Sequence, residues 1–389
     1  MRLILLIFAA FFSLACNTSK KTTPSIIMGA IQFEEYLPLI KNKRVGLVVN
    51  QTSVIGTTHL VDTLLSMGVE IKSIFAPEHG FRGVADAGEH VKDGIDTKSG
   101  LPIISLYGEH RKPTTEDLQD IDVILFDIQD VGVRFYTYIS TMHYVMEACA
   151  EQNKKMIVLD RPNPNGHYVA GPVLDLAFRS FVGMHPIPIV HGLTVGELAQ
   201  MINGEEWLKD KVKCDLMVVK MKNYTHKTPY SLPIKPSPNL PNDRAIALYP
   251  SLCLLEPTIM SVGRGTPFPF QVVGYPDSTY GSFLFTPVST KGASKYPKHQ
   301  DQNCFGEDLR INPKELEFSL KWILNYYKKY NSTAFITSES FFDKLAGNDT
   351  LRGLLKQGMS EKDIKATWQN DLNIYLKKRS NYLLYSDFK

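Results

Sequence analysis

Concentrated charge of one sign is missing from this sequence. The 389 residues include 43 basic and 40 acidic side chains, for a net charge of +3, and neither sign forms a long run or a stripe. Proteins that bind nucleic acid gather basic residues to meet the phosphates, so we expect no nucleic acid as a partner. With 43% hydrophobic and 21% charged residues, the chain has the composition of a globular protein. Its length predicts two domains.

Motifs that hold cofactors or metals are also absent. HExxH does not occur, no GxGxxG follows the first predicted strand, and GxxxxGK[ST] is missing, so we expect no cofactor. The GxSxG motif of serine hydrolases is absent too. Glu-His pairs at 78–79, 89–90 and 109–110 keep a metal-dependent hydrolase open as an alternative. Adjacent side chains diverge, however, so no single pair makes a good chelate and we expect no metal.

Cysteine is scarce and follows no pattern. CxxC does not occur, and Cys149, Cys214, Cys253 and Cys304 have spacings that match no zinc or redox motif. Cys149 lies in an apolar helical segment and is expected to be a buried thiol. A disulfide among the four stays open, because the sequence cannot choose partners.

The N-terminus has the pattern of an export signal. Arg2 precedes an apolar stretch at 3–12, which is too short for an ordinary membrane span. The stretch ends in Ser13-Leu14-Ala15-Cys16, similar to a bacterial lipobox except that Ser13 replaces the usual Leu. We therefore expect residues 1–16 to form a signal peptide and lipobox, Cys16 to carry the lipid, and residues 17–25 to be a tether. The alternative is a plain cleaved signal peptide. Both predict export, to the periplasmic side of a bacterial membrane.

Apolar segments alternate with helical patterns through the first half of the chain. The apolar segments are almost continuously hydrophobic, which is typical of a parallel sheet covered by helices on both faces. Amphipathic patterns predict the helices between them. The expected strands are residues 44–52, 69–78, 101–107, 122–127 and 155–160, and the expected helices are residues 59–67, 114–118 and 138–153.

The composition becomes loop-like near residues 179–188, and we place a domain boundary there. The predicted fold is α/β, with a Rossmann-like parallel-sheet domain at 26–184 followed by a smaller α+β domain at 185–389. Thr194 and Glu197 form a capping box at the start of a helix. The second domain is expected to contain helices at 195–203, 312–330, 342–345, 350–356 and 360–378, a strand at 215–220 and a proline-rich loop at 229–250.

Polar residues stand at the carboxyl end of each predicted strand of the first domain. Ligands of open α/β sheets bind outside this edge, so we expect these ends to converge on one site. The five strand ends carry Asn50, Glu78, Glu109, Asp127 and Asp160. The loop that begins at Glu78 is also rich in ionisable residues and glycine, a composition typical of a site.

Two glutamates of this loop suit the splitting of a sugar linkage. Glycoside hydrolysis needs one carboxylic acid to protonate the leaving oxygen and a second group as base, nucleophile or charge stabiliser. Glu78 and Glu89 could face each other across a pocket, with His79 and Arg82 tuning their pKa values. Alternatively, one of the two, Glu89 or Glu78, only anchors the loop through backbone N–H groups.

Aromatic and basic residues elsewhere could complete a sugar site. Tyr136 and Tyr138 could form a platform with a polar handle, although many aromatic residues must belong to the core. Arg264 lies between two glycines, where a guanidinium suits a carboxylate. The alternative is an arginine that ties its own loop.

Several long motifs resemble the bacterial exo-β-N-acetylmuramidase family, formerly catalogued as a domain of unknown function. The resemblance covers about residues 44–385 without a clear departure. Its motifs are PEHGFRG at 77–83, ADAGE at 85–89, DIQDVGVRFYTY at 127–138, LDRPNP at 159–164, GPV at 171–173, PSPNLP at 236–241 and SVGRGT at 261–266.

The resemblance implies an enzyme that removes terminal N-acetylmuramic acid from the non-reducing end of peptidoglycan fragments. It also implies a Rossmann-like domain and a smaller C-terminal domain with the site in the cleft between them. Glu78 and Glu89 would be the catalytic carboxylates. The implied substrate-binding residues are His79, Arg82, Asp127, Asp130, Arg134, Tyr136, Asn239, Glu256 and Arg264.

Three hypotheses follow. The first is this glycosidase, acting on a peptidoglycan-derived glycan. The second is a non-catalytic lipoprotein that binds cell-wall sugars, which would bind fragments and release no product. The third is a metal-dependent amide or ester hydrolase, which a chelator would inhibit.

Overall fold

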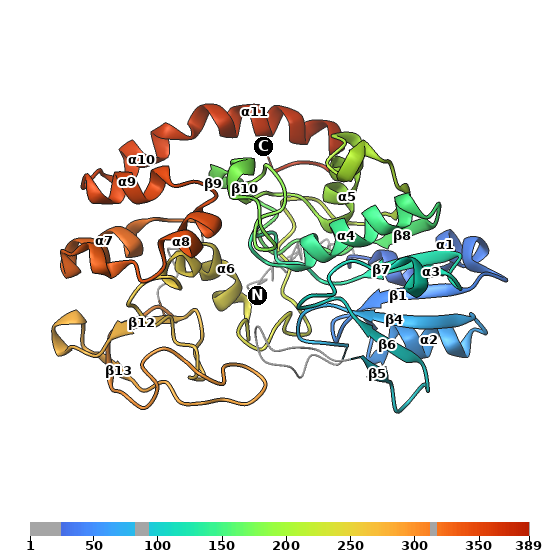
Figure 1. The fold of residues 1–389 in the computed structure, drawn as a ribbon, viewed down its shortest axis with the longest axis horizontal. Helices are drawn as coiled ribbons and strands as arrows, with labels where there is room; N and C mark the ends of the chain where they lie inside the picture. The colour runs from blue at the N-terminus through green and yellow to red at the C-terminus, as the bar shows by residue number, and fades with distance from the viewer. Residues whose placement is uncertain (1–24, 82–92, 312–316, 389) are drawn as a thin grey trace, which may run out of the picture.

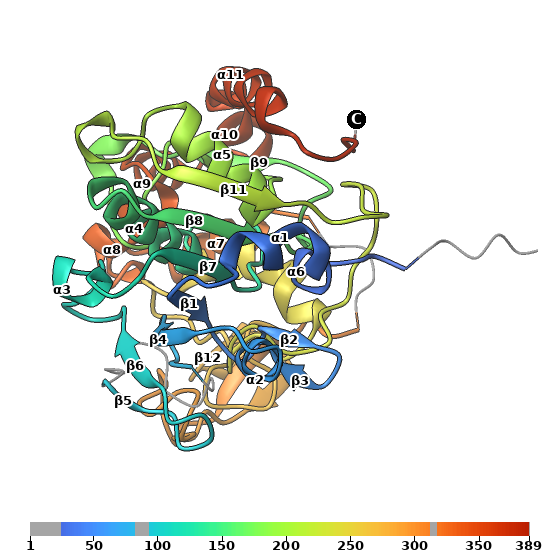
Figure 2. The same ribbon diagram turned by 90° about the vertical axis from the view of Figure 1, so that its right-hand side faces the viewer.

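A seven-stranded sheet forms the first half of the protein (Figures 1 and 2). The computed structural model describes residues 25–81, 93–311 and 317–388. The strand order is β11-β8-β7-β1-β4-β6-β5, and only the short edge strand β5 runs antiparallel to its neighbour. The bounds are β1 (Val45–Val49), β4 (Ile71–Ala76), β5 (Gly94–Ile95), β6 (Pro102–Ser105), β7 (Val123–Asp127), β8 (Lys155–Leu159) and β11 (Asp215–Val219).

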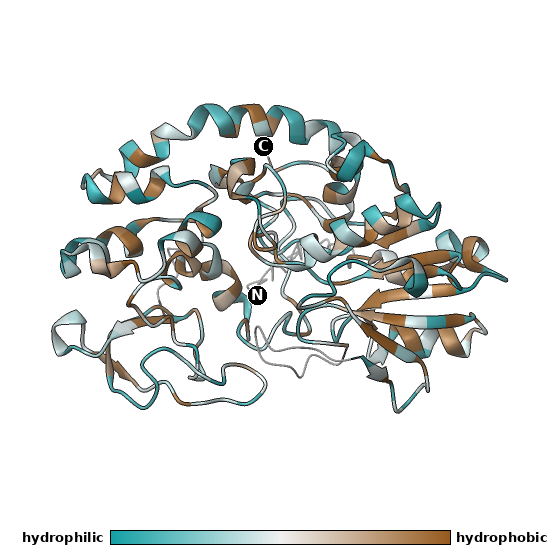
Figure 3. Ribbon diagram, in the orientation of Figure 1, coloured by the Kyte–Doolittle hydropathy of each residue, from teal (hydrophilic) through white to brown (hydrophobic). Residues whose placement is uncertain are grey.

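Helices cover both faces of this sheet, as the hydrophobic strands require. In β1 the side chain of Val48 packs on one face and those of Leu47 and Val49 pack on the other. The Val48 face is covered by α4 (Tyr138–Glu151) and α5 (Val195–Gly204), with α3 (Thr115–Leu118) nearby, and the opposite face by α1 (Phe33–Ile40) and α2 (Leu60–Ser66). The strands are mostly brown in the hydropathy view (Figure 3). The predicted α/β sheet domain is confirmed.

The sheet continues beyond residue 184, which is the predicted end of the first domain. A hairpin of β9 (Ala170–Val173) and β10 (Pro188–Val190) crosses that position. The chain then returns through α5, which begins at the predicted capping box of Thr194 and Glu197, and adds β11 beside β8. The predicted boundary is therefore too early for the sheet, because the loop-like segment is an excursion within this half.

The second half combines a small antiparallel sheet with a set of helices. The sheet has the order β12-β14-β13, from Val272–Tyr275, Cys304–Asp308 and Phe283–Phe285. Residues 312–316 of the helix predicted at 312–330 lie outside the described residues, and α7 begins at Lys321. The helix predicted at 360–378 is divided at Trp368. The helices are α6 (Asp243–Leu252), α7 (Lys321–Tyr330), α8 (Glu339–Ala346), α9 (Thr350–Lys356), α10 (Glu361–Thr367) and α11 (Gln369–Arg379).

One hydrophobic core joins the two halves. The cluster on the Val48 face of the sheet continues through α4 to buried residues of the helical half such as Leu248, Trp322 and Phe342. Cys149, Cys214, Cys253 and Cys304 are buried free thiols. Within the described ranges, no helix is long and apolar enough to cross a bilayer.

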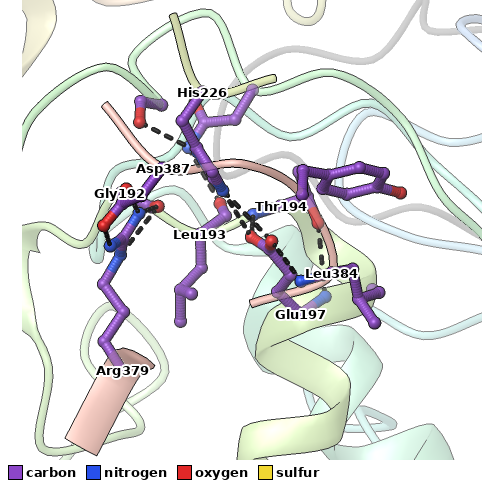
Figure 4. Close-up of polar contacts among 12 residues, drawn as sticks. Gly192, Leu193, Thr194, Glu197, His226, Arg379, Leu384 and Asp387 are labelled. Carbon is purple, nitrogen blue, oxygen red and sulfur yellow. Dashed lines mark hydrogen bonds and ion pairs between the residues drawn. The ribbon is translucent and has the colours of Figure 1, made fainter. Parts of the chain in front are cut away.

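The C-terminal segment returns to the sheet half and is held there by polar contacts (Figure 4). The Leu384 N–H donates to the Glu197 carboxylate at 2.9 Å, and the Tyr385 hydroxyl donates to Asp160 at 2.6 Å. Asp387 pairs with Arg379 of α11, whose guanidinium also donates to the Gly192 carbonyl. The C-terminal segment is thereby joined to residues 160–197 of the sheet half.

Candidate active site

The turn after β4 presents Glu78 at the carboxyl edge of the sheet. The Gly80 N–H donates to the Pro77 carbonyl at 2.9 Å, and both His79 and Gly80 have a left-handed backbone, with φ of 70° and 75°. A left-handed non-glycine residue costs on the order of 1–3 kcal/mol, and such strain clusters at functional sites. Phe81 is buried with its ring 4.8 Å from that of His59 and anchors the turn in the core.

Glu78 lies at the N-terminus of α4. The hydroxyl of Thr137, the N-cap residue of this helix, donates to Oε2 of Glu78 at 2.6 Å. The positive end of a helix dipole is a favourable place for a carboxylate. Burial, followed by the charge of Glu78, raises the pKa of the Tyr107 phenol. Glu78 is thus fixed by two elements, the β4 turn and the start of α4.

A cavity opens beside Glu78 between the sheet half and the C-terminal half. One wall comes from the ends of β4 and the segment before α4, and the other from the proline-rich loop, α6 and the loop before β12. The described lining consists of Glu78, His79, Phe135, Tyr136, Thr137, Ser237, Asn239, Leu240, Tyr249, Arg264 and Phe270. Among these residues Glu78 is the single carboxylate, so acid–base or nucleophilic chemistry from the described lining centres on it.

Tyr136 contributes a buried polar group to this lining. Its ring lies edge-on to those of Tyr138 and Tyr249, with centroid distances of 4.9 and 6.1 Å. The hydroxyl is buried without a hydrogen-bond partner among the described residues, and burial raises its pKa. Because a buried hydroxyl without a partner is costly, this group is suited to a bond with a ligand.

Arg264 reaches the cavity from a glycine-flanked turn. Gly263 and Gly265 have φ of 80° and 78°, and a Cβ on Gly265 would lie 2.5 Å from the Val288 carbonyl oxygen. The guanidinium binds Glu256 through Nε and Nη2 at 2.9–3.0 Å and lies 4.9 Å from the Phe270 ring. Burial opposes its charge, but Glu256 more than offsets this and raises the pKa of Arg264. With five N–H donors, the group retains donors beyond those that bind Glu256.

Five predicted site residues share the cavity, and a sixth binds one of them. Glu78, His79, Tyr136, Asn239 and Arg264 line it, and Glu256 positions Arg264. The Asn239 side chain donates through Nδ2 to the Ala293 carbonyl at 2.7 Å. Glu89, Arg82 and Cys16 lie outside the described residues. The geometry of the predicted pair of glutamates is therefore given for Glu78 alone.

Three other predicted substrate-binding residues lie outside the described lining and have internal partners. Asp127 forms a buried ion pair with Arg161, at 2.5 and 2.8 Å. Asp130 accepts from the Gly132 N–H at 2.6 Å, and burial raises its pKa to about 7. Arg134 is fully buried and donates to the carbonyls of Pro172, Ile187, Leu345 and Ala346. Substrate contact by these three residues stays a prediction, and the structure adds that each has hydrogen-bond partners within the fold.

The ends of the five strands lie at one edge of the sheet, as predicted, but of the five polar residues only Glu78 is in the described cavity lining. The strands before all five polar residues are parallel, so their carboxyl ends share one edge. Asn50, Asp127 and Asp160 are fully buried there and Glu109 is exposed, while Glu78 lines the cavity.

Thr137, Tyr249 and Phe270 line the cavity without having been singled out in the sequence. Thr137 belongs to the 127–138 motif and precedes a predicted helix, a signal that could have found it. Tyr249 and Phe270 gave no such signal. Within the described ranges, no three His, Cys, Asp or Glu side chains gather as a set that could hold a metal ion.

These features define an α/β protein with a carboxylate-bearing cavity between two halves, the layout of an enzyme for a small polar ligand. Two family models match the sequence, "Exo-beta-N-acetylmuramidase NamZ, N-terminal" over residues 45–244 and "Exo-beta-N-acetylmuramidase NamZ, C-terminal" over residues 247–385. The chain belongs to the exo-β-N-acetylmuramidase NamZ family, as the sequence motifs predict.

Relatives of known sequence or structure match almost the whole chain. The peptidoglycan β-N-acetylmuramidase NamZ of Bacillus subtilis (strain 168) is 40% identical, covering 90% of this chain and 89% of that protein. A crystal structure of a DUF1343 family protein from Bacteroides fragilis NCTC 9343 has a TM-score of 0.87 at 46% identity, covering 94% of this chain and 100% of that one. A second protein of this family from the same organism has a TM-score of 0.81 at 32% identity, covering 93% and 99%.

Proposed function

We propose that the protein is an exo-β-N-acetylmuramidase that releases terminal N-acetylmuramic acid from the non-reducing end of peptidoglycan fragments during cell-wall turnover. The observation that carries the proposal is the 40% identity to the Bacillus subtilis enzyme over nearly the full length of both chains. The position of Glu78 in a cavity between the two halves supports it.

The lining suits a sugar that carries an acid group. N-acetylmuramic acid has a lactyl carboxylate, which a guanidinium can bind through paired N–H groups. Arg264 supplies such a group beside Glu256, which holds it in place. The Tyr136 hydroxyl, buried without a partner among the described residues, is assigned to a polar group of the same sugar.

Glu78 acts as one of the two carboxyl groups that glycoside hydrolysis needs. The resemblance assigns the second role to Glu89. The two roles respond differently to the leaving group, since an activated aryl leaving group needs little protonation whereas an alkyl sugar oxygen needs a general acid. Comparing Glu78→Gln and Glu89→Gln on both kinds of substrate therefore assigns acid and nucleophile or base.

The test of the function is turnover of a chromogenic N-acetylmuramic acid glycoside and of natural fragments. Glu78→Gln is expected to lower kcat by about 10²-fold or more while thermal unfolding stays unchanged. Glu109→Gln is the matched control, because this exposed glutamate follows the neighbouring strand β6. A near-native rate for Glu78→Gln on the natural fragments would refute the assignment, because both carboxyl roles are needed for an alkyl leaving group. Fragment binding by wild type without product would instead favour the sugar-binding lipoprotein.

We also propose that the protein is exported and anchored to a bacterial membrane by a lipid on Cys16, on the periplasmic side where its substrate lies. The apolar segment at 3–12 and the lipobox-like residues 13–16 support this. In detergent phase separation the wild-type protein is expected in the detergent phase and Cys16→Ala in the aqueous phase. Recovery of both in the aqueous phase would leave only a cleaved signal peptide.

A further inference from the structure

A basic loop stands beside the candidate active site and has no role in the chemistry described so far. This loop, residues 286–303, connects β13 to β14 and extends from the small sheet toward the middle of the molecule (orange in Figure 1). It carries Lys291, Lys295, Lys298 and His299 against a single carboxylate, Asp301. Lys298 and His299 bond to the carbonyls of Glu256 and Ile259, so the charge that favours an anionic ligand is that of the exposed Lys291 and Lys295.

The basic loop is attached to the cavity wall at two places. The Ala293 carbonyl accepts from the Asn239 side chain at 2.7 Å, and Asn239 lines the cavity. Further along, Pro297 packs on Gly265 so closely that a Cβ on this glycine would lie 2.7 Å from the proline. Gly265 follows Arg264, another lining residue. The Lys298 ammonium also donates to the carbonyl of Glu256, the partner of Arg264, at 2.9 Å.

Lys295 and Tyr296 lie between these two attachment points. The Tyr296 side chain is 81% exposed although its neighbour Pro297 is buried. The Lys295 ammonium lies 5.5 Å from the centre of the Tyr296 ring. Since consecutive Cα atoms are about 3.8 Å apart, the Cα of Tyr296 is within about 11 Å of that of Ala293. An aromatic ring and the Lys295 ammonium therefore lie on the part of the loop between its two attachment points, one of which is the lining residue Asn239.

Single exposed apolar residues are common on protein surfaces and need no explanation. Tyr296 differs in its position, because the chain before it is fixed to the lining residue Asn239 and the chain after it packs on Gly265, the neighbour of the lining residue Arg264. An enzyme that removes a terminal sugar encloses that sugar, so the rest of the glycan must leave through the opening. A wall at the opening is then the surface that the remaining glycan meets first.

We propose that the basic loop forms the subsite for the part of the substrate that remains outside the cavity. The sugar next to the released residue stacks its C–H face on the ring of Tyr296. Lys291 and Lys295, both exposed, bind the carboxylates of an acidic peptide attached to the remaining glycan. The inference rests on the proposed function and deepens it, because it assigns these residues to the recognition of the leaving group. Such remote binding raises kcat/KM when it is used in the transition state.

The test compares three substrates that differ only outside the released sugar. They are a chromogenic muramic acid glycoside, a peptide-free glycan fragment, and a fragment with an acidic peptide on the part that remains. Tyr296→Ala is expected to lower kcat/KM about fivefold on both glycan fragments, in line with one aromatic contact, and to leave the chromogenic glycoside unchanged. The double variant Lys291→Ala/Lys295→Ala is expected to lose about threefold or more on the peptide-bearing fragment alone.

Ile374→Ala is the matched control, since Ile374 is 58% exposed on the outer helix α11. It should behave as wild type on all three substrates. Equal losses on every substrate, or no loss on the fragments, would overturn the subsite. If the wild-type protein turns over none of the substrates, the proposed function itself fails. These two failures are therefore distinguishable.

Discussion

At the scale of single residues, partners decide the role of an ionisable group. Glu78 and Asp127 both follow buried strands of one sheet, yet only Glu78 lines the cavity, whereas Asp127 is held by Arg161. The sequence could predict that both stand at the same edge. It could not predict the partner, because Arg161 lies on a different strand end and no local pattern joins the two residues.

Burial of Asp130 predicts that the unfolding free energy of the protein depends on pH. Its pKa is raised to about 7 by burial, so between about pH 4 and pH 7 the native state binds a proton that the unfolded state has lost. Its contribution to stability is therefore present at low pH and is lost as the pH rises to about 7. Asp130→Asn should abolish this loss, so the variant should gain in unfolding free energy relative to wild type, by roughly 1.4 kcal/mol for each pKa unit at most.

Urea unfolding of both proteins from pH 4 to pH 8 would measure this difference. Asparagine keeps an acceptor for the Gly132 N–H, which is the bond that Asp130 makes. His191, whose Nε2 lies 3.9 Å from Asp130, has its pKa lowered to about 3 by burial and does not titrate in this range. A difference between the two proteins that is constant with pH would contradict the prediction.

At the scale of elements, Arg134 ties α8 to the hairpin of the sheet half. Its guanidinium donates to the last carbonyls of α8, at Leu345 and Ala346, and to the Pro172 and Ile187 carbonyls at the hairpin. A cation at a helix C-terminus is favoured by the helix dipole. Burial without a neighbouring carboxylate lowers the pKa of this arginine to about 9. The charge of the guanidinium is therefore stabilised by the four carbonyls to which it donates.

Replacing Arg134 should therefore cost stability rather than substrate affinity. Arg134→Met removes four buried hydrogen bonds to carbonyls, and we expect a loss of about 3 kcal/mol or more in unfolding free energy. Arg352→Met is the control, because Arg352 reaches α8 from α9 at the surface through Asp343 and Glu339 and should cost about 1 kcal/mol or less. Urea unfolding measures both. Equal costs for the two variants would argue against the role given to Arg134.

Most elements of the sheet half follow from hydrophobic pattern alone. Buried strands such as β1 and β7 are continuous apolar runs, and the helices between them have amphipathic spacing. The sequence could not predict that β11 belongs to this sheet, because β11 follows a hairpin whose composition resembles that of a linker. The positions of Tyr249 and Phe270 in the cavity wall could not be predicted either, since contacts between residues far apart in the sequence leave no local pattern.

At the scale of the whole molecule, the C-terminal segment completes a polar network in the first half. The Tyr385 hydroxyl donates to Asp160 at 2.6 Å and accepts from the Met221 N–H at 2.9 Å. Tyr385→Phe removes both bonds at once. We expect a loss of about 2 kcal/mol in unfolding free energy, because hydrogen bonds to charged groups contribute more than neutral ones.

Tyr382→Phe provides the comparison on the same segment. The Tyr382 hydroxyl donates to Glu205 at 2.8 Å, but both residues are partly exposed, so the expected loss is about 1 kcal/mol or less. Chemical denaturation of the two variants near pH 8 would rank them. Should Tyr382→Phe prove the more costly change, the buried network would not be what fastens the segment.

The contacts of the C-terminal segment can form only after the rest of the sheet half has been synthesised. Asp160 and Glu197 cannot receive the bonds of Tyr385 and Leu384 until residues 384 and 385 have been synthesised. A nascent chain on the ribosome therefore carries an unfinished first half with buried acids still short of donors.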